Sequence, residues 1–259
     1  MPTCCAQWFY NLVLLPLLRL AVRVKARKDC KLREGLERRR EVWKRLGKSL
    51  GDRDWQKPLL WFHVASAGEF LQAQPVISRC VAEGWQCVLT YSSINALRWV
   101  ERLGGVPEVL AVDFLPEDTS FNVRRLLGLI QPSGIVHVSY DLWPNLIWEA
   151  QRQGIPQGLI SALVHAGSAR EAKGVGRALY RSLYEALEFI GAVAEADRAR
   201  ILRSAPQHPE VFVMGDTRCD SVLERRERLS PPEFPEVASG KFILVAGSTW
   251  PPDEQCLTP

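Results

Sequence analysis

The sequence lacks the residue patterns that hold metals and common nucleotide cofactors. It has only four histidines and seven cysteines, and no two cysteines form a C-x-x-C pair or stand with a histidine at metal-ligand spacing. We therefore expect free thiols in a reducing compartment and no zinc site. The G-x-G-x-x-G and G-x-x-x-x-G-K-[ST] signatures are also missing, which argues against a dinucleotide fingerprint and a P-loop. Internal repeats and low-complexity tracts are absent as well.

Length and composition are ordinary for a globular protein. The chain has 259 residues, of which 47% are hydrophobic and 24% are charged. A chain of this length can bury roughly 75% of its unfolded surface in one sizeable domain or two small ones. The net charge of +4 is mild. The basic residues nevertheless crowd into residues 1–50, which points to a separate function for that segment.

Residues 1–50 combine an apolar run with a basic stretch. The run from Trp8 to Val24 contains a proline and two arginines, and it is marginal in length for a membrane-spanning helix. Its charges follow the apolar run, whereas in a secretory signal they precede it. An apolar anchor with a polybasic flank (Arg19 to Arg45) is typical of a helical segment that lies on an anionic membrane surface. A single membrane span, and a buried helix followed by a solvated charged face, remain alternatives. Nucleic acid is not expected as a partner, because the basic stretch has no aromatic platform apart from Trp43.

From residue 56 to residue 229, short apolar runs alternate with segments of helical periodicity. This alternation predicts an α/β fold, a Rossmann-like domain with a parallel sheet and helices on both faces. The predicted strands are 59–64, 86–91, 109–112, 134–138, 157–160, 190–194 and 211–214. The predicted helices are 70–82, 94–103, 120–130, 146–153, 175–187, 196–202 and 220–228.

The turn after the first predicted strand carries the leading candidate for catalysis. The strand 59–64 ends in a small-residue segment, Ala65-Ser66-Ala67-Gly68-Glu69, and helical spacing follows. Glu69 is thereby placed in the first turn of a helix at the carboxyl end of a strand, the edge where open α/β sheets bind ligands. Ser66 to Glu69 also fit a capping box, in which the glutamate stabilises the start of the helix. The sequence leaves both roles open.

The character of the chain changes after the charged helix. Residues 230–240 form a proline-rich linker that cannot continue a helix. Residues 241–249 then predict a new first strand with a small-residue turn, and we interpret residues 241–259 as the start of a second, truncated domain. Since a lone strand is not a domain, we expect most of that second domain to be missing from this sequence.

Four ordered motifs resemble those of a single family. These are His63-Val64-Ala65-Ser66-Ala67-Gly68-Glu69, similar to H-[SV]-x-S-x-G-E; Asp141-Leu142-Trp143-Pro144-Asn145, similar to E-L-W-P-N; Gly215-Asp216-Thr217-Arg218-Cys219-Asp220, similar to G-[ND]-x-[KR]-F-D; and Gly247-Ser248-Thr249, similar to [GT]-S-T. The family is that of the 3-deoxy-D-manno-octulosonic acid (Kdo) transferases of lipopolysaccharide synthesis. Order and spacing agree across nearly the whole chain. Ser139, Tyr140 and Cys219 depart from the residues that many members carry.

The resemblance implies a B-type glycosyltransferase fold, in which an N-terminal half faces the acceptor and a C-terminal half holds the nucleotide sugar. It implies inverting transfer of Kdo from the donor substrate CMP-Kdo to a lipid A precursor, at the cytoplasmic face of the inner membrane. No metal and no further cofactor are implied. Glu69 takes the role of general base. The resemblance places Ser66, Gly68, Asp141, Trp143 and Asn145 on the acceptor side, and Arg218, Ser248 and Thr249 on the donor side.

Other roles for these residues stay open. Pro144 suits the first turn of a helix, and Asp141 is a candidate cap for that helix. Arg218 suits the phosphate of CMP or the carboxylate of Kdo, but it also fits a solvated hinge. For the chain as a whole, the missing second half favours a different class of function, a non-catalytic, membrane-bound remnant that binds a lipid or a protein partner.

Overall fold

The computed structural model describes residues 2–102, 106, 109–168, 174–228 and 244–257. The chain divides into two compact units, Met1–Leu223 and Glu224–Pro259. The first unit contains the whole sheet. The predicted linker 230–240 lies outside the described residues, as do residues 241–243 of the predicted strand.

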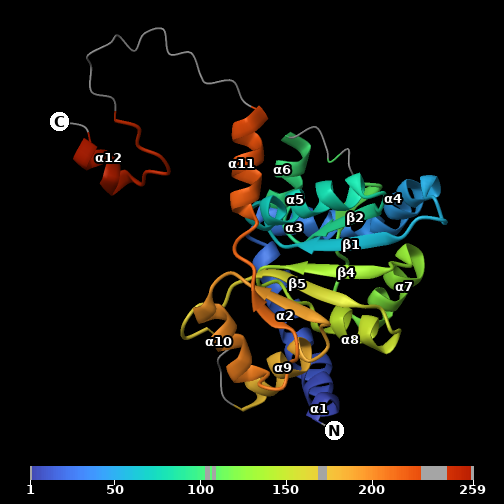
Figure 1. Ribbon diagram of the computed structural model, residues 1–259. Helices are drawn as coiled ribbons and strands as arrows, with labels where there is room; N and C mark the ends of the chain where they lie inside the picture. The colour runs from blue at the N-terminus through green and yellow to red at the C-terminus, as the bar shows by residue number, and fades with distance from the viewer. Residues whose placement is uncertain (1, 103–105, 107–108, 169–173, 229–243, 258–259) are drawn as a thin grey trace. The chain divides into compact units, whose positions relative to one another are not determined.

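A seven-stranded sheet forms the centre of the first unit, and every neighbouring pair of strands is parallel. The predicted Rossmann-like sheet is therefore confirmed (Figure 1). The spatial order is β3-β2-β1-β4-β5-β6-β7. In chain order the strands are β1 (Leu59–Val64), β2 (Gln86–Tyr91), β3 (Ala111–Phe114), β4 (Gly134–Val138), β5 (Gln157–Ala162), β6 (Phe189–Ala192) and β7 (Val211–Val213).

The third strand begins two residues later than the predicted range 109–112. The predicted range ends at residue 112 because a charged residue such as Asp113 normally marks the end of a strand. In the structure Asp113 lies inside β3 and is only 3% exposed. Arg45 makes this burial possible, since its guanidinium donates to both carboxylate oxygens of Asp113, at 2.8 and 2.7 Å. A buried charge is tolerated when a bidentate partner of opposite sign meets it.

Side chains alternate between the two faces of the sheet and build a core on each. Leu59 and Trp61 of β1 belong to a cluster with residues of α4, α7 and α8, whereas Phe62 and Val64 belong to a cluster with residues of α5 and α6. Such alternation is the period of two that a strand imposes. The helices concerned are α4 (Val42–Ser49), α5 (Ala67–Ala82), α6 (Ile94–Arg102), α7 (Ser120–Ile130) and α8 (Pro144–Arg152); α9 (Val175–Tyr184) and α10 (Glu195–Ser204) follow.

The N-terminal apolar run forms one continuous helical rod that is partly docked onto the sheet domain. It comprises α1 (Pro2–Phe9), a π-helical turn η1 (Tyr10–Leu14) and α2 (Leu15–Ala26), and α1 runs beside α9 (Figure 1). Ala6, Tyr10 and Leu15 are buried in a core cluster with Trp148 of α8. Segment Cys5–Ala26 is long and apolar enough to cross a membrane, judged by length and composition only. α3 (Cys30–Arg38), capped by Asp29, and the 3-10 turn η2 (Arg39–Glu41) lead on to α4.

The described residues of the second unit comprise the end of one helix, an irregular segment and one short helix. Helix α11 (Arg218–Arg228) begins two residues before the predicted range and crosses the division between the units. The strand predicted over 241–249 is not present in its described part, 244–249, which adopts no regular structure. A single strand without a neighbour has nothing to pair with, which is the physical reason for this correction. Residues Pro251–Leu257 form α12.

Candidate functional site

The order of the strands places one edge of the sheet at a topological switch point. From β1 the chain moves outward through β2 to β3, then returns to β4 on the other side of β1 and continues outward to β7. In open parallel sheets the crevice for ligands lies outside the carboxyl ends of the strands where this reversal occurs. The turns after β1 and β4 therefore share the candidate site, and they carry the motifs that end in Glu69 and Asn145.

Glu69 lies where the sequence predicts, in the first turn of α5 at the carboxyl end of β1. Its side chain is only 2% exposed, and the carboxylate accepts a hydrogen bond from the backbone N–H of Ala65. Ser66 is the N-cap, and its hydroxyl accepts from the Glu69 N–H at 3.4 Å. The capping arrangement is thus present, with the carboxylate reaching one residue further back than in the usual box. Ser66 and Gly68 are half-buried beside it.

Asp141, in the turn after β4, accepts a group of hydrogen bonds that joins this turn to β1 and to the turn after β2. Its Oδ2 accepts from the indole N–H of Trp143 at 2.8 Å and from the Ser92 hydroxyl at 3.1 Å, and it lies 3.1 Å from Nε2 of His63. His63 belongs to β1 and is fully buried. Its Nδ1 lies 2.8 Å from the Thr90 hydroxyl. With a proton on Nε2, the ring donates toward Asp141, and Nδ1 is placed to accept from the Thr90 hydroxyl.

These contacts decide the charge of Asp141. Burial alone raises the pKa of a carboxyl group, but the hydrogen bond and electrostatic attraction of His63, followed by the hydrogen bonds from Trp143 and Ser92, outweigh it and hold the pKa of Asp141 below its usual value. The carboxylate is therefore ionised at neutral pH, and its side chain keeps 22% of its surface exposed. Of the two carboxylates at the switch point, Asp141 is the one open to solvent.

Asp141 does not cap α8, so that prediction was wrong. The cap comes from Asp118, in the loop between β3 and α7, whose carboxylate accepts from the backbone N–H groups of Asn145 and Leu146, both at 3.0 Å. Asp118 also accepts from the Tyr10 hydroxyl at 2.8 Å. Burial raises the pKa of Asp118 to about 6 in spite of these bonds. No local pattern reveals this cap, because the residue that provides it is distant in sequence.

Asn145 faces inward and connects α8 to the N-terminal helix. It is 2% exposed, and its side-chain amide donates to the Asp118 carbonyl at 2.6 Å and to Asn11 at 2.9 Å. Trp143 is half-buried, with its ring edge-on to that of His63. Of the residues expected on the acceptor side, Asp141 and Trp143 thus lie together at the carboxyl edge of the sheet. Asn145 is instead buried against Asn11 and Asp118.

Arg218 is paired at the end of the sheet. The turn at Gly215, which has a φ of +88°, brings Asp216 back onto Arg218, and the guanidinium donates to the carboxylate at 2.9 and 2.5 Å. Burial raises the pKa of Asp216, but the bonds from Arg218 and Gln72 outweigh it and lower that pKa. An anion that binds Arg218 therefore has to compete with Asp216.

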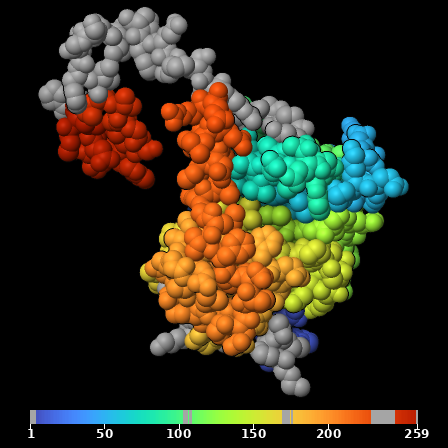
Figure 2. Space-filling model, viewed as in Figure 1, coloured from blue at the N-terminus to red at the C-terminus, as the bar shows by residue number. Residues whose placement is uncertain are grey.

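The residues around Arg218 hold the helix that carries Glu69. Pro75 lies inside α5 and has no N–H for the carbonyl of Leu71, four residues earlier. The hydroxyl of Ser221 donates to this carbonyl at 2.5 Å, and the hydroxyl of Thr217 donates to the carbonyl of Gln72 at 2.7 Å. The first turn of α11 consequently packs against α5 (Figure 2). The sequence analysis did not predict that Thr217 and Ser221 support α5. The available signal was Pro75, a proline inside a helical pattern.

Ser248 and Thr249 belong to the second unit, so their geometry is described within that unit alone. Within their own unit, the Thr249 hydroxyl donates to Glu254 at 3.0 Å, and Ser248 has a positive φ of 57°. Among the described residues, no group of three or more His, Cys, Asp or Glu side chains could hold a metal ion.

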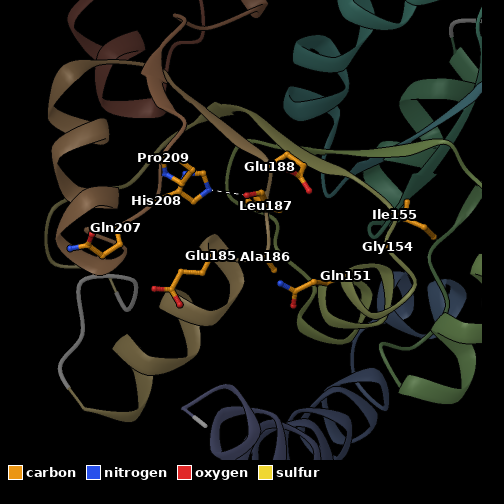
Figure 3. Close-up of a pocket in the computed structure, with 10 residues that line it drawn as sticks. All are labelled: Gln151, Gly154, Ile155, Glu185, Ala186, Leu187, Glu188, Gln207, His208 and Pro209. Atoms are coloured by element: carbon orange, nitrogen blue, oxygen red, sulfur yellow. Dashed lines mark hydrogen bonds between the residues drawn. The ribbon is translucent and has the colours of Figure 1, made fainter.

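A hollow of about 410 Å³ lies at the opposite edge of the sheet, at the amino ends of β5, β6 and β7 (Figure 3). Its lining includes Gln151, Glu185 and His208, and Nε2 of His208 lies 2.9 Å from the Leu187 carbonyl. Because parallel sheets bind ligands at the carboxyl ends of their strands, we do not place the site there. A second cavity, of about 310 Å³, adjoins the carboxyl edge and is lined in part by Ser92 and Trp143.

Comparisons with known sequences identify relatives of one kind. A family model described as 3-Deoxy-D-manno-octulosonic-acid transferase (kdotransferase) matches residues 37–221. The chain is 32% identical over 193 residues to the 3-deoxy-D-manno-octulosonic acid transferase of Bordetella pertussis, covering 73% of this chain and 44% of that protein. It is 28% identical over 206 residues to the protein of the same name from Chlamydophila psittaci, covering 78% and 47%. The chain thus spans about half the length of the curated relatives it matches.

Comparison with solved structures agrees on the architecture. The UDP-N-acetylglucosamine 2-epimerase of Rickettsia bellii aligns with a TM-score of 0.52 at 12% identity, covering 66% of this chain and 48% of that one. The UDP-GlcNAc 2-epimerase of Neisseria meningitidis aligns with a TM-score of 0.50 at 17% identity, covering 66% and 50%. At such identities the likeness shows the fold alone. It supports the expected lobe of a two-lobed, B-type fold.

The bond from Ser221 to the proline-containing helix can be tested by a double-mutant cycle. Ser221→Ala should lower the free energy of unfolding by about 1–3 kcal/mol in urea denaturation, because the half-buried Leu71 carbonyl loses its donor. Pro75→Ala supplies a helical N–H to the same carbonyl. The cost of Ser221→Ala should therefore fall below about 1 kcal/mol in the Pro75→Ala background. Equal costs in the two backgrounds would show that the Ser221 hydroxyl does not replace the missing helical donor.

Proposed function

Because the chain belongs to the 3-deoxy-D-manno-octulosonic acid transferase family, we propose that it supplies the acceptor-side lobe of a glycosyltransferase. The reaction is the inverting transfer of Kdo from CMP-Kdo to a lipid A precursor. The observation that carries the proposal is the meeting of two family motifs at the switch point, where the turns holding Glu69 and Asp141 flank the carboxyl ends of β1 and β4.

In this proposal Glu69 is the general base. A hydroxyl oxygen of the acceptor attacks the anomeric carbon of Kdo, the bond from that carbon to the CMP phosphate breaks, and the hydroxyl proton passes to the Glu69 carboxylate. Proton transfer requires an approach of about 3 Å. Since the carboxylate accepts from the Ala65 N–H and is buried, it must turn outward when the acceptor binds. Asp141, Trp143, Ser66 and Gly68 line the path to it on the acceptor side.

The donor side is proposed on the family's pattern. CMP leaves as an anion, so cationic side chains and backbone N–H groups must stabilise it. Arg218 is the candidate in the first unit, and a phosphate or carboxylate group would take the place of Asp216 on its guanidinium. Ser248 and Thr249 are the donor-side candidates of the second unit, on the family's pattern alone. The donor is a substrate, and the proposal includes no metal and no other cofactor.

The membrane enters the proposal through the N-terminal helical rod. Its outer face exposes large apolar side chains, and the basic residues Lys25, Arg27, Lys28, Lys31 and Arg33 that follow are exposed as well. Tyr10 bonds to Asp118 and Arg19 bonds to Glu117 at 2.5 Å, which fixes about 14 Å of the helix along the domain. A helix fixed in this way lies in the membrane surface and does not cross the bilayer. We place that surface at the cytoplasmic face of the inner membrane.

One observation favours a second candidate function. The Glu69 carboxylate stabilises the start of its own helix, which is the arrangement expected of a structural residue. In a lobe that only binds a lipid or a protein partner at the membrane, the Glu69 carboxylate would stay at the start of α5 whether or not the partner is bound.

A transfer assay separates the two functions. With CMP-Kdo and a lipid A precursor, product formation would make the chain by itself an enzyme, and Glu69→Gln should then lower the rate by about a hundredfold or more, because an amide cannot accept the proton. Glu210→Gln, the same change at an exposed residue directly before β7 and at the opposite edge of the sheet, serves as the control and should retain the rate. If neither the chain nor the Glu69→Gln variant forms product, the chain by itself is not the enzyme.

Vesicle binding tests the proposed membrane surface. Leu12 is 63% exposed on the helical rod, and Phe121 is 69% exposed on α7. Leu12→Glu should weaken sedimentation with phosphatidylglycerol vesicles by about tenfold, since burying one large apolar side chain contributes about 1.5–3 kcal/mol. Phe121→Glu introduces the same charge at similar exposure and should leave binding unchanged. Equal losses in the two variants would contradict the assignment of the helix as the membrane face.

A further inference from the structure

A cavity of about 310 Å³ lies between the N-terminal helical rod and the loops at the carboxyl edge of the sheet. Its walls are mainly apolar, formed by Leu15, Leu18, Val22, Leu32 and Leu36. Leu18 and Val22 are themselves exposed on α2. The cavity therefore opens on the same helix that carries the outward-facing apolar side chains.

A second chamber, of about 440 Å³, adjoins the first and is more polar than it. The two share Arg23, Leu36, Arg39, Pro116 and Glu117 as lining residues. The polar chamber adds Arg40, whose side chain is exposed, and Trp43. An apolar compartment thus continues into one with several arginines. The two compartments match the two parts of a molecule that has a hydrocarbon chain and an anionic head.

The charges at this junction do not balance. Four arginines line the two chambers, Arg19, Arg23, Arg39 and Arg40, against the two acids Glu117 and Asp118. Glu117 is already bonded to Arg19 at 2.5 Å and lies 4.0 Å from Arg23. Asp118 accepts from Tyr10 and from the start of α8. Both acids are engaged, so a surplus of positive charge faces the chambers.

Among the four arginines, Arg39 contributes most clearly to this surplus of positive charge. Within the described part of the chain its guanidinium donates to three backbone carbonyls, those of Leu115 and Gly35 at 3.0 Å and that of Ser92. Burial lowers the pKa of Arg39. A half-buried cation that is met by carbonyl dipoles is more stable once an anion approaches it.

We propose that the two chambers bind one phosphate-bearing lipid molecule from the membrane surface. One acyl chain fills the space between Leu18, Leu32 and Leu36, and the phosphate lies against Arg23, Arg39 and Arg40. Charge complementarity and continuity with the exposed apolar face of the helix select this occupant. The proposal is independent of the transfer reaction, because it concerns binding alone.

The location gives the bound lipid a role at the switch point. Ser92 and Trp143 line the apolar chamber, and both donate to Asp141. A lipid in the chamber therefore lies one side chain away from the ionised carboxylate of the candidate site. It would hold an acceptor head group, or a neighbouring lipid, at a fixed place beside that edge.

The test uses the full chain and dodecanoyl lysophosphatidic acid, an anionic lipid with one acyl chain, titrated below its micelle-forming concentration with tryptophan fluorescence as the signal. Saturable one-to-one binding is expected. Dodecanoyl lysophosphatidylcholine, which has the same chain and a zwitterionic head, should bind about tenfold more weakly, and inorganic phosphate more weakly still. Equal affinity for the two lipids, or no saturation, would overturn the proposal.

Two pairs of variants locate the binding. Leu18→Trp, which fills the apolar chamber, should weaken lysophosphatidic acid binding about tenfold, whereas Leu12→Trp on the same helix should not. Arg40→Glu should weaken it similarly, whereas Lys48→Glu, an exposed charge reversal on α4, should not. All four altered residues are exposed, so the variants are expected to fold. Losses that do not distinguish the cavity variants from their controls would place the lipid elsewhere and refute the proposal.

Discussion

The reversal of strand order between β1 and β4 is the constraint on which the rest of the structure depends. Because all neighbouring strands are parallel and these two are adjacent, the turns that follow them open at one edge of the sheet although they are far apart in sequence. The contact between His63 of β1 and Asp141 of the second turn then joins them through a buried histidine. Without that adjacency, Glu69 and Asp141 would belong to unrelated loops.

The N-terminal helical rod is part of the same arrangement. A single carboxylate, that of Asp118, caps α8 and accepts from Tyr10 of the rod. Asn145 adds a second connection, through Asn11. The start of α8 is thus fixed by the element that we place on the membrane, and Trp143 directly precedes it. Contact with a membrane and the geometry of the candidate site are consequently linked by short, buried hydrogen bonds.

Sequence patterns predicted the elements whose cause is local. Apolar runs bounded by small residues gave β1, β2 and β4 with their observed limits, and the capping pattern placed Glu69 in the first turn of α5. Features with a distant cause could not be predicted. The limits of β3 depend on Arg45, the cap of α8 on Asp118, and the integrity of α5 around Pro75 on Ser221. In each case the partner is at least 27 residues away in sequence, as for Asp118 and Asn145, and only the folded chain brings the two together.

The central claim is that the acceptor binds at the edge formed by the carboxyl ends of β1 and β4. Photo-crosslinking with a lipid A precursor that carries a photoactivatable group beside its reactive hydroxyl, followed by peptide mapping, tests it most directly. The account predicts labelling confined to residues 65–69 and 140–143, and competition by unmodified precursor. Labelling of the opposite edge, around Gln151 and His208, with residues 65–69 and 140–143 unlabelled, would contradict it.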